Sequence, residues 1–390
     1  MPKSALRRRT SPANKANNFK FYGTKSFSAR LIYIGYNHAR LLGVGTITHT
    51  YKHRHMVSVY SAAHFLVDFA CAFLMFRSIA GAPDWYTCVL IYNFCAFAMQ
   101  MPIGIIADKL NRNFLVAAVG CALVGTAYGL CSFPLAASII VGLGNGMFHV
   151  GGGIDVLNIS AEKSGALGVF VSPGAFGIYF GTMLGKGRTL SAAPILLALL
   201  VAVVLILVMQ RTRGEAHSDN AEFSLEGGTS PQVLVAAVCL FLVVCLRSYV
   251  GLTLNFPWKG AGYWGVAAVC AVALGKTAGG FMADRFGVFK TSGISLGLAA
   301  LLFLIPAIPA AGVLSLLLFN MTMPVTLWAV ARVFPGAKGF SFGLLTFGLF
   351  LGFLPVHLGV DSTSQAPWMF AIAAAVSLTL LWLGLKKAKL

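Results

Sequence analysis

Two ionisable side chains, His64 and Asp68, lie four residues apart in a stretch that is otherwise almost wholly apolar. In a helix this spacing puts both side chains on one face. A carboxylate can bind and release a proton, and a neighbouring imidazole can relay that proton or tune its binding. The pair predicts a proton-coupling site, and a structural hydrogen-bonded pair that fixes one helix to another is the alternative.

Two basic residues, Arg247 and Lys276, lie in similar apolar stretches of the second half of the sequence. A charged side chain at the centre of a membrane costs about 2.5–3.5 kcal/mol on insertion scales. We therefore expect both residues to face a polar interior, where they would bind an anionic substrate or form a gate with Asp68. For Arg247 the alternative is a side chain that extends to the membrane surface.

The composition requires a membrane around these side chains. Of the 390 residues 58% are hydrophobic and only 10% are charged, and the mean hydropathy is +0.81. Soluble domains are about 25% charged, so most of this surface must face lipid. The eight cysteines fall in or beside apolar stretches without the paired spacing of a zinc site. We expect free thiols, no metal and no cofactor.

The apolar stretches are long enough for helices that cross a bilayer, which takes about 20 residues. They lack the alternation of a barrel strand. The fold class that we predict is an all-α integral membrane protein with twelve transmembrane helices in two pseudo-symmetric six-helix bundles. The predicted spans are 57–77, 86–107, 114–132, 134–150, 164–185, 189–209, 232–251, 261–283, 291–309, 311–334, 337–358 and 366–385.

The domain boundaries follow from the polar segments. Residues 56–210 and 232–390 would form the two bundles, and residues 211–231 have the Gly, Ser and acidic composition of a flexible linker. Residues 1–55 hold eleven Lys or Arg and no acid, within a net charge of +18. We interpret this basic tail as translated upstream sequence that is not part of the mature fold; a disordered arm on anionic lipid and an organelle transit peptide are the alternatives.

Loop charges predict the orientation. With residue 56 in the cytoplasm, the inner segments carry twelve Lys or Arg after the tail and the outer segments carry four. This excess favours both termini inside. We expect a monomeric, multi-pass protein of the cytoplasmic membrane. Its partners would be the lipid bilayer, a small-molecule substrate and protons, and it would not bind nucleic acid.

A short repeat supports the division into halves. The sequence GIIADK begins at Gly104 after the second predicted span, and GFMADR begins at Gly280 after the eighth, 176 residues later. Small residues at Gly104 and Gly280 would let helices approach closely. Each repeat ends in an acid and a base, namely Asp108 with Lys109 and Asp284 with Arg285. Such an acid can pair with a base or face the N-terminus of a partner helix.

This duplicated motif resembles the signature loop of the major facilitator superfamily, over residues 57–390. The resemblance implies a latch that is made and broken during transport; topological anchoring by charge is the alternative. It also implies that the fourth and tenth spans line a central cavity. Asn145 and Asn320 are therefore candidate substrate-binding or gating residues, although amides in such spans also join helices by hydrogen bonds. His149, two residues before three successive glycines, is a further candidate for gating, and a capped helix end is the alternative.

Two further segments loosely resemble the fosmidomycin-resistance branch of that superfamily, which comprises proton-driven drug exporters. They are AHFLVDF from Ala63, and GLGNGMFHVGGG from Gly142. Where that branch has proline and an acidic residue after the histidine, this chain has Val150 and Gly151. Three successive glycines from Gly151 also predict the end of the fourth helix, which would put His149 at the membrane boundary.

These features together predict a secondary transporter that works by alternating access, and no enzyme. We expect proton-coupled efflux of a small amphipathic compound, with proton-coupled uptake of a small organic anion as the alternative. A membrane-embedded transferase would need clustered acids or histidines on its loops, and the loops here are short and poor in acids. A sensor built on a transporter scaffold is the other reading from a different class.

Overall fold

The structure is a computed structural model that describes residues 44–160, 162–188, 190–213, 224–225, 230–359 and 366–390. Most of the basic tail and most of the predicted linker lie outside the described residues. The chain divides into two units, residues 1–51 and residues 52–390. The description below concerns the second unit.

The helices of the N-terminal half share simple start signals. Proline at the first position begins two of them, where its fixed φ suits a helix. The elements are α2 (Val44–Leu74), π-helix η1 (Met75–Ile79), α3 (Trp85–Asn93), π-helix η2 (Phe94–Ala98), α4 (Gln100–Leu110), α5 (Asn113–Ala127), 3₁₀-helix η3 (Tyr128–Leu130), α6 (Pro134–Ile159), α7 (Gly165–Val171), α8 (Pro173–Gly187) and α9 (Ala193–Arg213).

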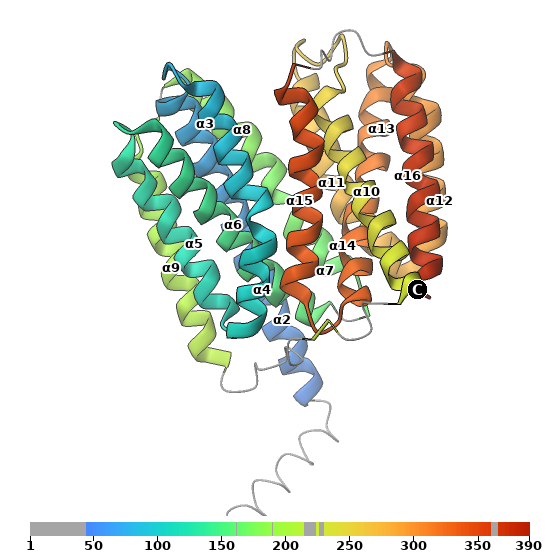
Figure 1. The fold of residues 1–390 in the computed structure, drawn as a ribbon, viewed down its shortest axis with the longest axis horizontal. Coiled ribbons are helices and arrows are strands. Elements are labelled where there is room, and N and C mark those ends of the chain that lie inside the picture. The colour runs from blue at the N-terminus through green and yellow to red at the C-terminus, as the bar shows by residue number, and fades with distance from the viewer. Residues whose placement is uncertain (1–43, 161, 189, 214–223, 226–229, 360–365) are drawn as a thin grey trace, which may run out of the picture. The chain divides into compact units, whose positions relative to one another are not determined.

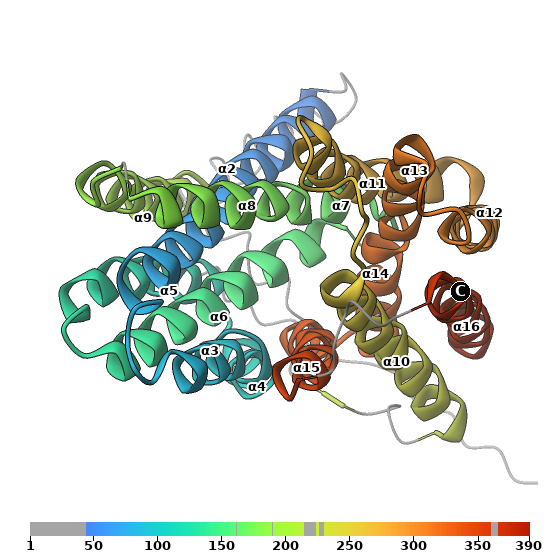
Figure 2. The same cartoon turned by 90° about the horizontal axis from the view of Figure 1, so that it is seen from above.

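The C-terminal half follows the same plan, and proline again opens three of its helices. Its elements are α10 (Pro231–Thr253), α11 (Trp264–Phe286), α12 (Val288–Phe303), α13 (Pro309–Asn320), α14 (Thr322–Val333), α15 (Lys338–His357) and α16 (Pro367–Lys387). Figures 1 and 2 show α2 to α6, α8 and α9 on one side and α10 to α16 on the other. The short α7 packs against α11 and α14 of the other half.

Eleven helices among the described residues are long and apolar enough to cross a membrane. Each overlaps one of the twelve predicted spans, and ten agree within a few residues, whereas the fourth helix continues to Ile159, nine residues beyond the predicted end. The helix for the predicted span 291–309 is shorter, because α12 begins at Val288 and ends at Phe303. Pro306 follows, and the residue before a proline is biased away from helix, so the prediction carried this helix too far.

The surface of the bundle suits lipid. On α9 the side chains of Leu197 and Leu200 are 63% and 60% exposed. Exposure of such large apolar side chains would be unfavourable in water and is favourable in lipid. The first span shows the reverse, since 72% of its most apolar window is buried inside the protein. The helix that carries His64 and Asp68 is therefore central, and α9 is peripheral.

Glycines set the spacing between α2 and α8. A methyl group on Gly177 or Gly181 would collide with the backbone oxygens of Phe65 and Phe69 in α2. Gly185 continues the same face one turn later. The four-residue glycine spacing therefore packs α8 directly on the helix that carries His64, as small residues do in membrane bundles.

The prediction that three glycines end the fourth span is wrong, because α6 continues through them. Gly151, Gly152 and Gly153 are buried and helical, and α6 continues to Ile159. A methyl group on Gly151 would collide with Asn113 O, so the glycine provides close contact with α5 rather than a break. Glycine lowers helix propensity, but in a packed membrane bundle the backbone has no water to bond instead.

Candidate functional site

Four polar side chains meet inside the N-terminal half. The His64 Nε2 atom lies 3.2 Å from Asp68 Oδ2 and 2.9 Å from His149 Nε2. Asn145 Nδ2 donates to Asp68 Oδ1 at 3.1 Å, and His149 Nε2 lies 3.6 Å from that same oxygen. All four residues are buried, with 2–9% of their surface exposed. We call this group the His–Asp cluster.

The hydrogen bonds of the His–Asp cluster fix where protons can be. His149 Nδ1 lies 2.9 Å from the backbone oxygen of Asn145, and a carbonyl oxygen can only accept, so Nδ1 donates. A neutral His149 then presents a lone pair at Nε2, and the proton in the contact between the two rings belongs to His64. One further proton on either ring or on Asp68 would change the charge of a buried group.

The prediction that His149 lies at the membrane boundary is wrong. His149 is one turn after Asn145 on an unbroken α6, so both reach the same face of α2. Two histidines and a carboxylate are also residue types that bind divalent metal ions. Among the described residues, His64, Asp68 and His149 form the one group of this kind, with candidate ligand atoms within 4.8 Å of one another.

The fifth span breaks beside the cluster. Pro173 has no N–H, so the carbonyl of Val169 loses its helical partner, and Ser61 Oγ of α2 donates to it at 3.3 Å. Two residues later, Lys276 Nζ of α11 donates to Val171 O at 3.2 Å. Lys276 therefore joins the two halves at this break, which the sequence did not predict.

Gly174 sits on the other side of the same break. A methyl group there would collide with Asp68 Oδ2 and His64 Nε2, so glycine lets the cluster touch the start of α8. Lys276 binds the Val171 end of this short segment, and Asp68 lies against its Gly174 end. The break thus lies between the acid of one half and the base of the other.

Arg247 points into the C-terminal half and does not extend to the membrane surface. Its side chain is buried, and its Nη2 atom donates to Thr322 Oγ1 at 3.0 Å and to Thr326 Oγ1 at 3.1 Å. No carboxylate lies within 4.0 Å of Arg247 or Lys276 in the part of the chain that the structure describes. The expected direct pair between Arg247 and Asp68 is therefore not made.

Asn320 is less central than the sequence predicted. It ends α13 and donates to Leu316 O of its own helix at 2.8 Å. Its side chain is half-buried. The contact satisfies the amide locally, and a role in substrate binding stays a prediction.

One repeated loop caps a helix of the opposite half. Asp108 Oδ1 and Oδ2 accept from Gly339 N at 2.8 Å and from Phe340 N at 2.9 Å. These are N–H groups of the first turn of α15, which have no partner within the helix. A methyl group on Gly104 would collide with Gly339 O, so the glycine allows this contact.

The second loop makes the equivalent contact in the reverse direction. Asp284 accepts from Ser164 N at 2.6 Å and from Gly165 N at 2.9 Å, at the start of α7. Ser164 Oγ adds a contact of 3.0 Å. Gly280 again faces backbone, here Ser164 O. We call these two caps, Asp108 on the start of α15 and Asp284 on the start of α7, the latch. The end of the molecule at which they lie is the latch end.

The bases of the repeat, Lys109 and Arg285, directly follow the two capping acids in the sequence. Lys109 is exposed at the end of α4, and the Arg285 guanidinium lies 5.5 Å from the centre of the Phe286 ring. Two other contacts across the halves were missed from the sequence. Arg332 Nη1 lies 2.8 Å from Glu162 Oε1, and Lys338 Nζ donates to Asn158 Oδ1 at 2.7 Å. They follow no motif, so only their positions in space reveal them.

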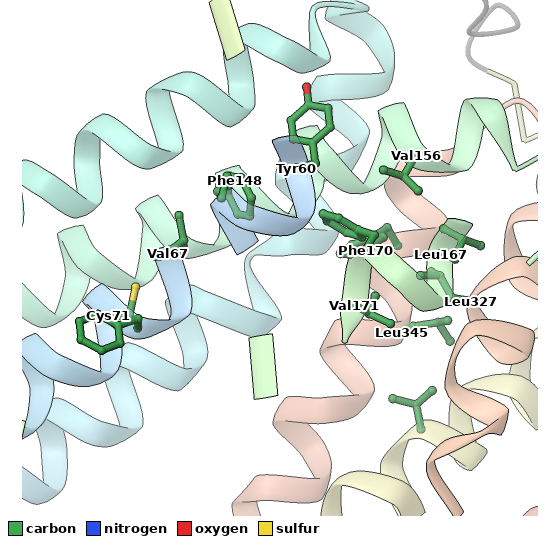
Figure 3. Packing of buried hydrophobic residues seen from close by; sticks show 14 of the residues in the cluster. Tyr60, Val67, Cys71, Phe148, Val156, Leu167, Phe170, Val171, Leu327 and Leu345 are labelled. Atoms are coloured by element: carbon green, nitrogen blue, oxygen red, sulfur yellow. The ribbon is translucent and has the colours of Figure 1, made fainter. Parts of the chain in front are cut away.

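Aromatic side chains pack beside the His–Asp cluster. The His64 ring lies 4.9 Å from Phe170, and Tyr60 lies 6.5 Å from Phe148. Figure 3 shows Tyr60, Phe148 and Phe170 among the buried hydrophobic residues. The Tyr60 hydroxyl donates to Asp155 Oδ2 at 2.6 Å. Asp155, in the last part of α6, is thus tied to the first span one turn from His64.

The arrangement of helices is similar to that of solved transporters. FucP, a major facilitator superfamily transporter in the outward conformation, matches with a TM-score of 0.61 and 14% identity over 85% of this chain and 97% of FucP. The proton:xylose symporter XylE matches with 0.58 and 14% over 85% and 96%. A bacterial homologue of the iron transporter ferroportin, in an outward-facing state, matches with 0.54 and 15% over 86% and 98%.

This chain has the major facilitator fold. No family model matches the sequence, and no curated protein matches it. In terms of the major facilitator fold, the His–Asp cluster joins the first and fourth spans, and Arg247 lies on the seventh. The latch joins the second span to the eleventh and the eighth to the fifth, one cap in each direction.

Proposed function

We propose that the protein is a secondary transporter that moves a small solute by alternating access, coupled to protons at the His–Asp cluster. The observation that carries this proposal is a buried carboxylate, Asp68, shared by two imidazoles and one amide. A purely structural pair would need one donor for each acceptor. Here the single Nε2–H of His64 faces two acceptors, His149 Nε2 and Asp68 Oδ2, and such a group gains or loses protons as its surroundings change.

Alternating access requires contacts between the halves that open without damage to either half. The latch has this property, because Asp108 and Asp284 hold backbone N–H groups at helix starts that water could satisfy instead. Each half supplies one acid and one helix start. A rocking motion that separates the latch end would break both caps together.

The break in the fifth span offers a link between protonation and this motion. Lys276 binds the Val171 end of this segment and Asp68 lies against its Gly174 end, so an ionised Asp68 would attract the ammonium group across it. A proton on Asp68 removes that attraction. The hydrogen bond from Lys276 to Val171 O, which joins the two halves, is then weaker, and the closed arrangement of the latch end is less stable. Proton binding would therefore favour opening at the latch end.

Arg247 and Lys276 favour a substrate with an anionic group. Both are buried or half-buried cations that donate to neutral oxygens of threonine side chains and of the backbone, so an anion would be a stronger partner. We infer efflux of a small amphipathic anion, in line with the resemblance to the fosmidomycin-resistance branch. Proton-coupled uptake of a small organic anion would use the same two cations and is the second candidate.

The test is transport by the purified protein in proteoliposomes with a pH-sensitive dye inside. Small aryl carboxylates, phosphonates and fosmidomycin are added with and without an imposed pH gradient, and proton and solute movement are recorded. For the natural sequence we expect solute movement that follows the gradient. Asp68→Asn keeps the shape of the side chain and removes its titration, so we expect gradient-driven movement to be lost.

Asp84→Asn is the matched control, because Asp84 is an exposed acid at the start of α3, away from the cluster. It should leave coupling unchanged. Full gradient-driven transport by Asp68→Asn would rule out the proton assignment. Transport of none of these anions, together with transport of neutral compounds, would rule out the substrate class while leaving the coupling site in place.

A further inference from the structure

A crevice of about 650 Å³ lies in the N-terminal half at the end of the molecule opposite the latch. Its walls come from α2 with η1, from α5 with η3 and from the start of α9. Its lining includes Phe73, Tyr128 and Leu196, so it is mostly apolar, and one charged residue, Arg77, lies at its edge. Transport as proposed above uses none of these residues.

Two glycines keep the crevice open. A methyl group on Gly129 would meet no atom within 4 Å, and one on Gly125 would meet only leucine methyl groups at 3.9 Å. Neither glycine is needed for a tight turn or for contact with a neighbouring helix. Close packing of helices therefore does not explain why these two positions are glycine, and the space beside them stays open at the surface.

The guanidinium of Arg77 has donors to spare. Its Nη1 atom donates to Arg188 O at 2.9 Å, and a guanidinium has five N–H donors in all. No acid lies within 4.0 Å of it among the residues described in this structure. Lys186, whose ammonium lies 4.8 Å from the centre of the Phe76 ring, adds a second cation nearby.

We propose that this crevice binds a phospholipid with an anionic headgroup, its phosphate on Arg77 and the upper part of one acyl chain beside Gly125 and Gly129. A planar guanidinium binds phosphate through two parallel hydrogen bonds, whereas the apolar wall accepts hydrocarbon. Basic side chains beside an apolar groove at the membrane surface are the pattern that selects anionic lipid. The loop charges predict that this surface is the outer one.

The test uses native mass spectrometry of the full chain in detergent with dioleoyl phosphatidylglycerol or dioleoyl phosphatidylcholine at equal concentration. We expect tighter binding of the glycerol lipid, by about fivefold for each cation that contacts the headgroup. Arg77→Gln should reduce its binding to that of the choline lipid. Gly129→Leu should reduce binding of both, because Gly129 lines the crevice and its Cβ position is open space that a larger side chain would occupy.

Lys259→Gln is the control, since Lys259 is an exposed cation between the seventh and eighth spans, outside the crevice. Equal binding of the two lipids by the unchanged chain, or undiminished selectivity in Arg77→Gln, would overturn the proposal. Inorganic phosphate added in excess should not displace the lipid. If it does, the site recognises free phosphate and the lipid assignment is wrong.

Discussion

The latch gives the sharpest quantitative prediction, through Asp108→Asn. The carboxylate accepts from two N–H groups of the first turn of α15, at 2.8 and 2.9 Å. Asparagine has one acceptor oxygen, so one N–H loses its partner and faces an NH₂ group instead. A hydrogen bond to a charged group contributes about 1.5–3 kcal/mol, and the charge at the start of a 20-residue helix adds to this.

Because these contributions overlap, we expect the closed latch end to lose about 2–3 kcal/mol relative to the open one. That corresponds to a shift of roughly 30- to 150-fold in the population ratio. Spin labels on cysteines at Leu110 and Lys290, which are exposed on opposite halves, would report it by double electron–electron resonance. The fraction of long distances should rise in Asp108→Asn and return towards its original value in Asp108→Glu.

Asp84→Asn serves again as a control, since it makes the same change at an exposed helix start. Asp284→Asn should have a similar effect, and the double variant should approach the sum of the two, because both caps open in one motion. An unchanged distance distribution in folded Asp108→Asn protein would refute the view that the caps hold the halves together.

Three further predictions follow from single contacts. Gly174→Ala should abolish gradient-driven transport and lower thermal stability by about 1–3 kcal/mol, because its methyl group collides with Asp68; a melting curve and the proteoliposome assay measure both. Gly181→Ala should destabilise the fold by a similar amount through the backbone of α2, yet leave the pH dependence of residual transport unchanged. Arg247→Lys keeps the charge but loses the two-threonine contact, so substrate affinity should fall about tenfold while proton movement per solute stays constant, as measured by binding and by flux ratios.

Much of the architecture could be predicted from the sequence because a bilayer imposes length and polarity on every span. Eleven predicted spans match helices of the structure. The error at α12 arose from Pro306, whose effect on the preceding residue outweighed a continuing apolar run. The error at Gly151 had the opposite cause, since helix packing overrode a local signal for a break.

The site divides in the same way. The four-residue spacing of His64 and Asp68 was enough to place both side chains on one face of one helix. The repeated Ala-Asp loops were enough to expect that their acids meet the starts of partner helices. Both inferences use only neighbours along the chain or a recurring motif. Only the tertiary structure brought Asn145 and His149 to Asp68, over 77 and more residues, and Lys276 to the break in the fifth span. Contacts between distant segments depend on the angle and depth at which helices pack, and those follow from many small side chains acting together.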